Sequence, residues 1–224
     1  MLKKIASLAS IAILASGVAA QGAIITLNNG GSVSPTTTGN FGTITLTQNV
    51  GSVTLSESLA SNEYFLTTGA GDALAFNLAG NPSLASVTTA IGSSLTSGYL
   101  LGGADSASPF GNYAFTILCD SACNSGGSAG LNANDHSFSF TLTGFTLDDF
   151  GVLSDASNHG PTAAYFASDI CVEASGTGCI ADGGGNVAAT SFTSTPATPE
   201  PSSLIMLGTG IVSAAGLMRR RFVN

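Results

Sequence analysis

The segment Ser137–Thr143 constrains the fold most, because it alternates strictly between polar and apolar side chains. Phe138, Phe140 and Leu142 stand at every second position, with Ser or Thr between them. Successive side chains of a β-strand point to opposite faces of the sheet. The pattern therefore predicts a strand with one buried face and one solvated face.

Similar short runs recur along the chain, separated by Gly, Asn and Ser. They cover residues 23–27, 43–47, 52–56, 64–66, 73–76, 113–118 and 163–166. Turn signals at Asn28–Gly31 and Asn49–Gly51 separate the first three runs. Between residues 21 and 193, no segment shows a 3.6-residue apolar stripe of helical length. The sequence therefore predicts an all-β fold, with a single β-sandwich or jelly-roll-like domain over residues 21–193.

The amino-terminal end has the pattern of a secretory signal peptide. Lys3 and Lys4 precede an apolar run, Ile5–Val18, which is followed by the small residues Ala19 and Ala20. This order is typical of a segment that signal peptidase removes. We expect a signal peptide over residues 1–20, with cleavage after Ala20 and Ala23 as an alternative position.

The carboxyl-terminal end has the pattern of a membrane segment. Residues 194–201 predict a stiff extended linker, and residues 202–218 predict a transmembrane segment with an uncharged apolar core, Leu204–Met218. As a helix this core is roughly 22 Å long, which is shorter than the ~30 Å hydrocarbon layer, and flanking residues extend it to the interfaces. The basic tail, residues 219–224, is expected to stay cytoplasmic because of Arg219, Arg220 and Arg221.

The same end resembles the PEP-CTERM sorting domain of Gram-negative bacteria that make exopolysaccharide. The resemblance rests on three parts in order, namely Pro199-Glu200-Pro201, the apolar span and the arginine cluster. It implies processing by exosortase, a membrane-embedded transpeptidase, near the Pro-Glu-Pro motif. The mature protein would then have no membrane span, as in GPI-anchored proteins. The β-rich passenger also resembles domains that precede this tail, which implies a fold but no activity.

Charge is distributed very unevenly along the chain. All five Lys and Arg residues lie in the two terminal segments, whereas residues 21–193 hold twelve carboxylates and two histidines. No Lys or Arg is present in this domain to pair with a carboxylate or to neutralise phosphate. We therefore exclude nucleic acid as a partner and expect a uniformly negative surface.

Four cysteines lie in the exported part, and an even number in an oxidising compartment predicts two disulfides. Sequence spacing favours Cys119 with Cys123 and Cys171 with Cys179, while the crossed pairings remain open. A zinc site is the competing interpretation, but the two-residue knuckle typical of such sites is missing. We expect no bound metal at these residues.

One segment matches the serine hydrolase motif G-x-S-x-G, with Ser128 at its centre. Asp148, Asp149 or Asp155 and then His159 follow in the order of an α/β-hydrolase. The motif requires a strand before the serine and a helix after it, and the flanking residues predict neither. We therefore expect no enzymatic activity, and we keep a secreted hydrolase as a minor alternative.

Other polar clusters suggest weaker alternatives. His136 beside Asp135 and His159 near Asp155 are candidate ligands or bases, although loop or strand-end histidines are the more common case. Calcium is an alternative cofactor because unpaired carboxylates supply hard oxygen ligands. Its candidate ligands are Asn132, Asn134, Asp135, Asp148, Asp149 and Asp155. Their spacing matches no calcium loop, so our expectation is that no cofactor is bound.

These observations lead to one functional expectation and one further alternative. We expect a non-enzymatic protein of the cell surface or of an exopolysaccharide-rich extracellular matrix, which passes through an inner-membrane intermediate. Its expected partners are the secretion machinery, signal peptidase and an exosortase-type transpeptidase, with exopolysaccharide as a further candidate. A carbohydrate-binding β-sandwich module is the alternative, because fold alone does not choose between them.

Overall fold

The structure is a computed structural model that describes residues 21–31, 38–61, 63–66, 72–120, 136–157, 160–173, 179–193 and 208–211. The described residues fall into two units, a β domain that ends by Pro196 and a carboxyl-terminal piece. Of the latter, the described residues Gly208–Ile211 form an exposed helical turn. Among the residues that the structure describes, no helix has both the length and the apolar character needed to cross a membrane.

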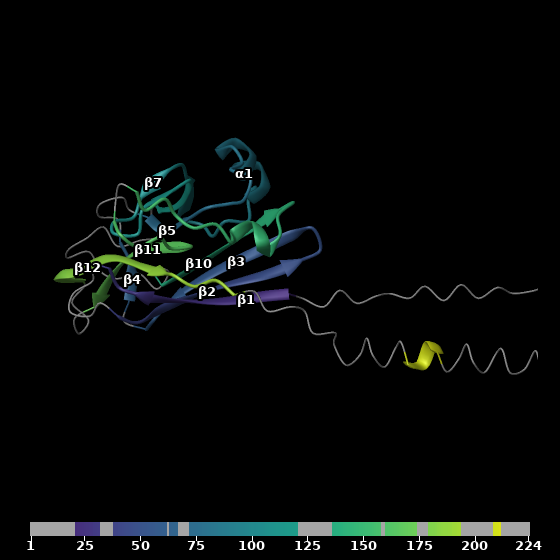
Figure 1. Cartoon of the computed structure of the whole chain (residues 1–224), viewed down its shortest axis with the longest axis horizontal. Helices are drawn as coiled ribbons and strands as arrows, with labels where there is room; N and C mark the ends of the chain where they lie inside the picture. The colour runs from purple at the N-terminus through teal and green to yellow at the C-terminus, as the bar shows by residue number, and fades with distance from the viewer. Residues whose placement is uncertain are drawn as a thin grey trace, which may run out of the picture. The chain divides into compact units, whose positions relative to one another are not determined.

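The β domain is built on one antiparallel sheet (Figure 1). Its strand order is β10-β3-β2-β1-β12-β11-β5-β9-β6, and β4 pairs with β11 beside this path. The strands are β1 (Gln21–Asn29), β2 (Thr38–Asn49), β3 (Ser52–Leu59), β4 (Glu63–Phe65), β5 (Asp72–Phe76), β6 (Tyr99–Gly102), β9 (Phe115–Cys119), β10 (Ser137–Thr143), β11 (Phe166–Glu173) and β12 (Cys179–Ala189). A two-stranded ribbon, β7 (Asp105–Ser106) with β8 (Asn112–Tyr113), forms a separate small sheet.

Most of the alternating segments fold as the sequence predicts, but residues 163–165 precede β11 and are not part of a strand. Along β10 the buried positions are Phe138, Phe140 and Leu142. The β2–β3 hairpin turns at Val50-Gly51 between the paired residues Asn49 and Ser52, and Gly51 has a φ of 72°, which glycine adopts without steric cost. The all-β prediction is confirmed.

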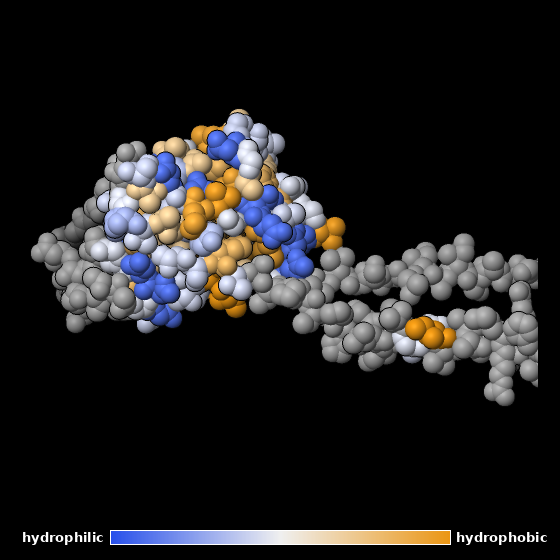
Figure 2. All heavy atoms as spheres, in the orientation of Figure 1, coloured by the Kyte–Doolittle hydropathy of each residue, from blue (hydrophilic) through white to orange (hydrophobic). Residues whose placement is uncertain are grey.

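The two halves of the sheet pack face to face, in a sandwich-like arrangement, around an aromatic core. The ring of Phe76 on β5 lies 5.8 Å from that of Phe140 on β10, and Phe65 on β4 lies 5.4 Å from Phe138. Strands from opposite parts of the strand order therefore meet across one interior. Outside this core, hydrophilic and hydrophobic residues lie side by side on the visible face of the domain (Figure 2).

Two hydroxyl side chains pair with the outer edge of β10. Thr96 accepts a hydrogen bond at Oγ1 from the backbone N–H of Ser139 and donates to its carbonyl, at 2.9 and 3.1 Å. Ser94 bonds the N–H and carbonyl of Thr141 in the same way, at 2.9 and 3.0 Å. These side chains stand in for a neighbouring strand, and so satisfy backbone groups that an edge strand normally leaves unpaired.

The sequence analysis found no segment of helical periodicity in the domain, yet the described residues include one α-helix. Residues Leu84–Ile91 form the short helix α1, which buries only Val87 and Ile91. The side chain of Ser83 caps it by accepting a hydrogen bond from the N–H of Ser86 at 3.2 Å. Two buried positions are too few to produce a detectable apolar stripe, so the helix is stabilised by its cap and by packing on the core.

The opposite face of β5, β11 and β12 is covered by the chain around the β7–β8 ribbon. A second apolar cluster forms there, made of Ala75, Ala107, Phe110, Tyr113, Ala164, Ala167 and Ala188. Small side chains on the sheet let this covering segment approach closely. As a result residues 166–171 of β11 are buried on both faces, which accounts for the lack of polar and apolar alternation there.

Candidate functional site

The predicted sorting residues and two of the candidate catalytic residues lie outside the described residues. These are Pro199, Glu200, Pro201, Arg219, Arg220 and Arg221 in the tail, and Ser128 and His159 in the domain. The hydrolase hypothesis is therefore not tested by the geometry. The same holds for calcium ligation by Asn132, Asn134 and Asp135.

The carboxylates proposed as hydrolase or calcium residues serve local structure. Oδ2 of Asp149 accepts hydrogen bonds from the backbone N–H and the hydroxyl of Thr146, at 2.7 and 2.9 Å, and so caps the 3₁₀ helix Leu147–Phe150. Oδ1 of Asp155 accepts from the N–H of Ser157 at 2.9 Å, and hydrogen bonds from the side chain and then the backbone of Ser157 lower the pKa of Asp155. Asp148 is exposed on the same 3₁₀ helix as Asp149. In the described ranges, no group of three or more His, Cys, Asp and Glu side chains is placed to hold a metal ion.

His136 is half-buried at the start of β10. Its ring lies 4.0 Å from that of Tyr64, at an angle of 44°. Its carbonyl accepts a hydrogen bond from the N–H of Leu59 at 2.8 Å. These contacts give His136 a packing role at the strand end.

The sulfur atom of Cys119 and that of Cys171 each take part in a disulfide bond, and no free cysteine occurs among the described residues. Neither Cys123 nor the side chain of Cys179 is described. The pairings of Cys119 with Cys123 and of Cys171 with Cys179 therefore stay predictions.

A set of buried carboxyl groups is the main feature that the sequence analysis missed. Glu57, Glu63, Asp72 and Asp169 have exposed fractions of 1, 5, 1 and 8 %. Neither oxygen of Asp72 has a hydrogen-bond partner, nor do Oε2 of Glu57 and Oε2 of Glu63. Buried carboxyl groups without cationic partners favour the neutral, protonated form.

Glu57 occupies a core-facing position. On β3 the buried residues are Val53, Leu55, Glu57 and Leu59, so Glu57 stands at one of the inward-facing positions of the strand. Its Oε1 accepts a hydrogen bond of 2.6 Å from the hydroxyl of Ser168. Burial raises the pKa of Glu57 well above its usual value, and the bond from Ser168 partly opposes this shift.

Asp72 and Asp169 form a second acidic group with Asp105, on the face that the β7–β8 ribbon covers. Burial raises the pKa of Asp72 to about 7, and the charges of Asp105 and Asp169 contribute to this rise. Burial also raises the pKa of Asp169 and that of Glu63 to about 7. Each pKa therefore falls near neutrality, where small changes of environment alter the charge of the group.

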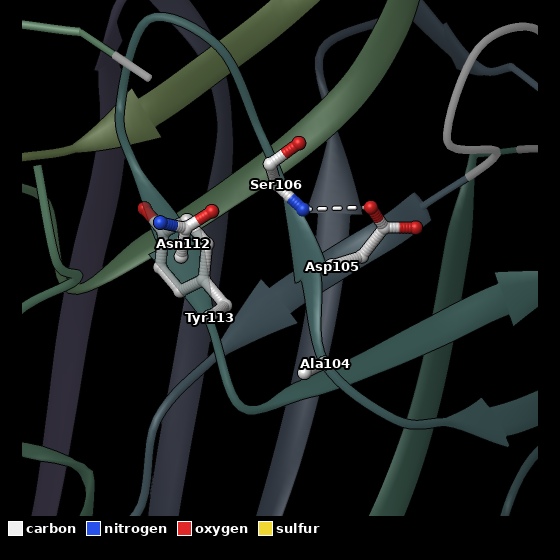
Figure 3. A pocket seen from close by; sticks show the side chains of 5 residues that line it. All are labelled: Ala104, Asp105, Ser106, Asn112 and Tyr113. Carbon is white, nitrogen blue, oxygen red and sulfur yellow. Dashed lines mark hydrogen bonds between the residues drawn. The ribbon is translucent and has the colours of Figure 1, made fainter. Parts of the chain in front are cut away.

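Asp105 also lines a surface pocket of about 280 Å³, together with Ala104, Ser106, Asn112 and Tyr113 (Figure 3). Figure 3 shows Asp105 and Ser106 on one strand of the ribbon and Asn112 and Tyr113 on the other. Oδ1 of Asp105 accepts a hydrogen bond from the N–H of Ser106 at 2.7 Å, which fixes one carboxylate oxygen. The pocket thus presents a carboxylate, a hydroxyl and an amide, whereas the side chain of Tyr113 is only 2 % exposed.

Backbone pairing holds this pocket in place. The N–H of Asn112 donates to the carbonyl of Asp155 at 2.9 Å, and the N–H of Asp155 donates to the carbonyl of Asn112 at 3.1 Å. Gly111, with a φ of 98°, lets Asp155 approach, because a Cβ there would lie 2.4 Å from the carbonyl oxygen of Asp155. No sequence signal marks the pocket, since strands of two residues have no periodicity.

Comparison with known proteins identifies the carboxyl-terminal end and leaves the β domain without a match. No curated protein and no solved structure matches the chain. The family model of the PEP-CTERM protein-sorting motif matches residues 197–221. The expected resemblance is therefore confirmed, and the chain is one that carries a PEP-CTERM protein-sorting motif behind a β-rich domain.

Proposed function

We propose that the protein is a non-enzymatic component of the cell surface or of an exopolysaccharide-rich extracellular matrix. The observation that carries the proposal is the sorting motif at residues 197–221, which directly follows the β domain. This motif implies processing by an exosortase-type system and delivery to the cell surface. The folded domain is then the cargo, and signal peptidase and exosortase are its processing partners.

The charge pattern supports an extracellular structural role. Every Lys and Arg of the chain lies in a segment that this processing would remove. The acidic and basic side chains of the mature domain would then be its carboxylates and two histidines, with no Lys or Arg. A net charge far from zero keeps such a domain soluble and directs it toward neutral or cationic partners.

The local roles of Asp149 and Asp155 favour this proposal over a hydrolase. Both side chains already accept hydrogen bonds from neighbouring backbone groups, in a helix cap and in a turn. A catalytic carboxylate would instead orient a histidine. If a fluorophosphonate probe labelled the wild-type chain but not Ser128→Ala, the result would favour the hydrolase hypothesis.

A carbohydrate-binding module is the second candidate, and the polar pocket favours it. Asp105, Ser106 and Asn112 line it beside the buried Tyr113, and they supply hydrogen-bond donors and acceptors. A few polar groups placed in a pocket can fix the orientation of a small ligand, and sugar hydroxyls are suitable partners for them. This candidate is compatible with surface delivery by the sorting motif.

Mass spectrometry of the carboxyl-terminal peptide, from cells and from medium, tests the proposal. We expect a terminus near Pro199–Pro201 in the wild type. Replacement of both Pro199 and Pro201 by Ala should leave the terminal arginines in place, whereas Pro196→Ala, in the preceding linker, should be processed normally. A wild-type chain that keeps Arg219–Arg221 would contradict the proposal, as would normal processing of the double variant.

A further inference from the structure

We propose that the pocket on the β7–β8 ribbon binds the ammonium group of an amino-sugar polymer. The inference rests on the proposed function, because it names the class of matrix polymer that the delivered domain would recognise. It assigns the cation to Asp105 and the hydroxyl groups of the sugar to Ser106 and Asn112. Three properties support it, namely the shape of the pocket, its charge and the composition of the whole domain.

The pocket is built on an ordered scaffold. The turn of the ribbon is closed by the N–H of Ala107 donating to Gly111 at 3.0 Å and by the N–H of Phe110 donating to Ala107 at 2.6 Å. Below it, the side chain of Tyr113 is only 2 % exposed. Polar groups on a fixed scaffold lose little conformational freedom when they bind a ligand.

The carboxylate of Asp105 gives the pocket a negative charge that attracts a cation. Asp105 is exposed, and its charge acts on the carboxyl group of Asp72, which is only 1 % exposed and has no hydrogen-bond partner at either oxygen. Asp169 acts on Asp72 from the neighbouring strand. No Lys or Arg occurs anywhere in residues 21–193 to offset these groups. A buried carboxyl group without a partner next to an exposed carboxylate is an arrangement that a bound cation stabilises.

The size of the pocket and the charge of the domain favour an amino sugar over other cations. A volume of about 280 Å³ lies at the lower end of small-molecule sites, which suits one ring of a polymer. Ser106 and Asn112 supply hydrogen bonds that an ammonium ion alone would leave unused. A polymer of uronic acids carries the same charge sign as the domain, and it would be repelled.

Calorimetric titration of the full chain, in nonionic detergent at pH 6 and low salt, tests the inference. The probes are a glucosamine hexamer, an N-acetylglucosamine hexamer and a galacturonic acid hexamer. The glucosamine and N-acetylglucosamine hexamers share a backbone, but only the glucosamine hexamer is cationic. The galacturonic acid hexamer is anionic. We compare the wild type with Asp105→Asn and with Asp148→Asn, an exposed carboxylate on the 3₁₀ helix Leu147–Phe150 that is not a lining residue of the pocket.

We expect the glucosamine hexamer to bind best, and added salt to weaken its binding. Asp105→Asn should weaken it by roughly tenfold, as expected for the loss of one charge-assisted contact. Asp148→Asn removes the same charge, and it should change the affinity by less than about twofold. Thermal unfolding of each variant shows that the fold is kept.

Three results would overturn the inference. They are no binding of the glucosamine hexamer, equal binding of its acetylated form, and equal weakening by the two variants. Mass spectrometry of the same chain as cells produce it separates this inference from the proposed function. A processed carboxyl terminus without binding contradicts only the pocket, and an unprocessed terminus contradicts the proposed delivery whatever the titration shows.

Discussion

The hydroxyl of Ser168 on β11 donates a hydrogen bond of 2.6 Å to the carboxyl group of Glu57 on β3, across the interior of the domain. Glu57 is 1 % exposed, and its second oxygen has no partner. The two strands lie in opposite halves of the sheet, so the bond connects them through the core. It also makes the stability of the domain depend on the protonation of a single buried group.

Glu57→Gln should stabilise the domain at alkaline pH. Burial raises the pKa of Glu57 in the folded state, so the folded protein holds a proton that the unfolded chain releases as the pH rises. The stabilisation is therefore complete at acidic pH and is lost as the pH rises through the folded-state pKa. Glutamine keeps the acceptor for Ser168 but does not ionise. Urea unfolding should give similar free energies for the two proteins at pH 4.5, and a higher free energy of unfolding for the variant at alkaline pH.

An exposed carboxylate provides the control for Glu57. Asp120→Asn removes a charge outside the core, and it should leave the pH dependence of unfolding unchanged. If Glu57→Gln were no more stable than the wild type at any alkaline pH, a neutral Glu57 in the folded state would be ruled out.

The wild-type domain should lose stability as the pH rises through neutrality. The pKa values of Glu63, Asp72 and Asp169 are raised to about 7 by burial, from ordinary values of 4.5 for Glu63 and 3.8 for the two aspartates. Between these limits the folded state binds more protons than the unfolded chain, so the free energy of unfolding falls with pH. Melting temperatures measured from pH 4.5 to 8.5 should decrease, most steeply at about pH 5–7, and should level off above about pH 8.

Asp72→Asn should flatten this pH profile, because the group that Asp105 and Asp169 repel can no longer ionise. Asp148→Asn, at an exposed position, should leave the slope as it is. A melting temperature that rises between pH 5 and pH 8 would show that these carboxyl groups are ionised and compensated in the folded state.

The sequence predicts strands wherever one face is buried and the other is wet. Ser137–Thr143 is such a strand, and the predicted alternation matches the observed burial along β10. The prediction stops at Ser56 on β3, although the inward series continues through Glu57 and Leu59. The register with β2 and β10, rather than the polarity of its side chain, places Glu57 inside. Nothing local in the sequence reports that register.

The candidate site was beyond sequence analysis for a different reason. Asp72, Asp105 and Asp169 lie far apart in the chain, and the pairing of β5 with β11 brings two of them together. The ribbon that carries Asp105 consists of two strands of two residues each, too short for any periodic signal. By contrast, the sorting motif is contiguous in the sequence, so the order of its residues is enough to identify it.

Thr96→Val should weaken the closure of the β10 edge. The change keeps the shape of the side chain, but it removes the group that bonds both the N–H and the carbonyl of Ser139. We expect a loss of about 1–3 kcal/mol in the free energy of unfolding, because a partly buried N–H is left without a partner. Amide hydrogen exchange at Ser139 should become faster.

Thr88→Val is the matched control for Thr96→Val. Thr88 is exposed on α1, and its hydroxyl donates to the carbonyl of Leu84 within the same helix. This substitution should cost well under 1 kcal/mol. Equal losses for the two variants would show that the bonds to the β10 edge add nothing to the general effect of a Thr-to-Val change.

Gly111→Ala should disrupt the β7–β8 ribbon and with it the pocket. A Cβ at this position would lie 2.4 Å from the carbonyl oxygen of Asp155, and the backbone φ of 98° is itself unfavourable for alanine. Gly144→Ala provides the control, since its φ is 85° but no atom lies within 4 Å of the added Cβ. Gly144→Ala should cost about 1 kcal/mol of unfolding free energy from backbone strain alone, and Gly111→Ala at least twice as much. If the two variants unfold at the same denaturant concentration, the close approach of Asp155 to Gly111 does not hold the ribbon in place.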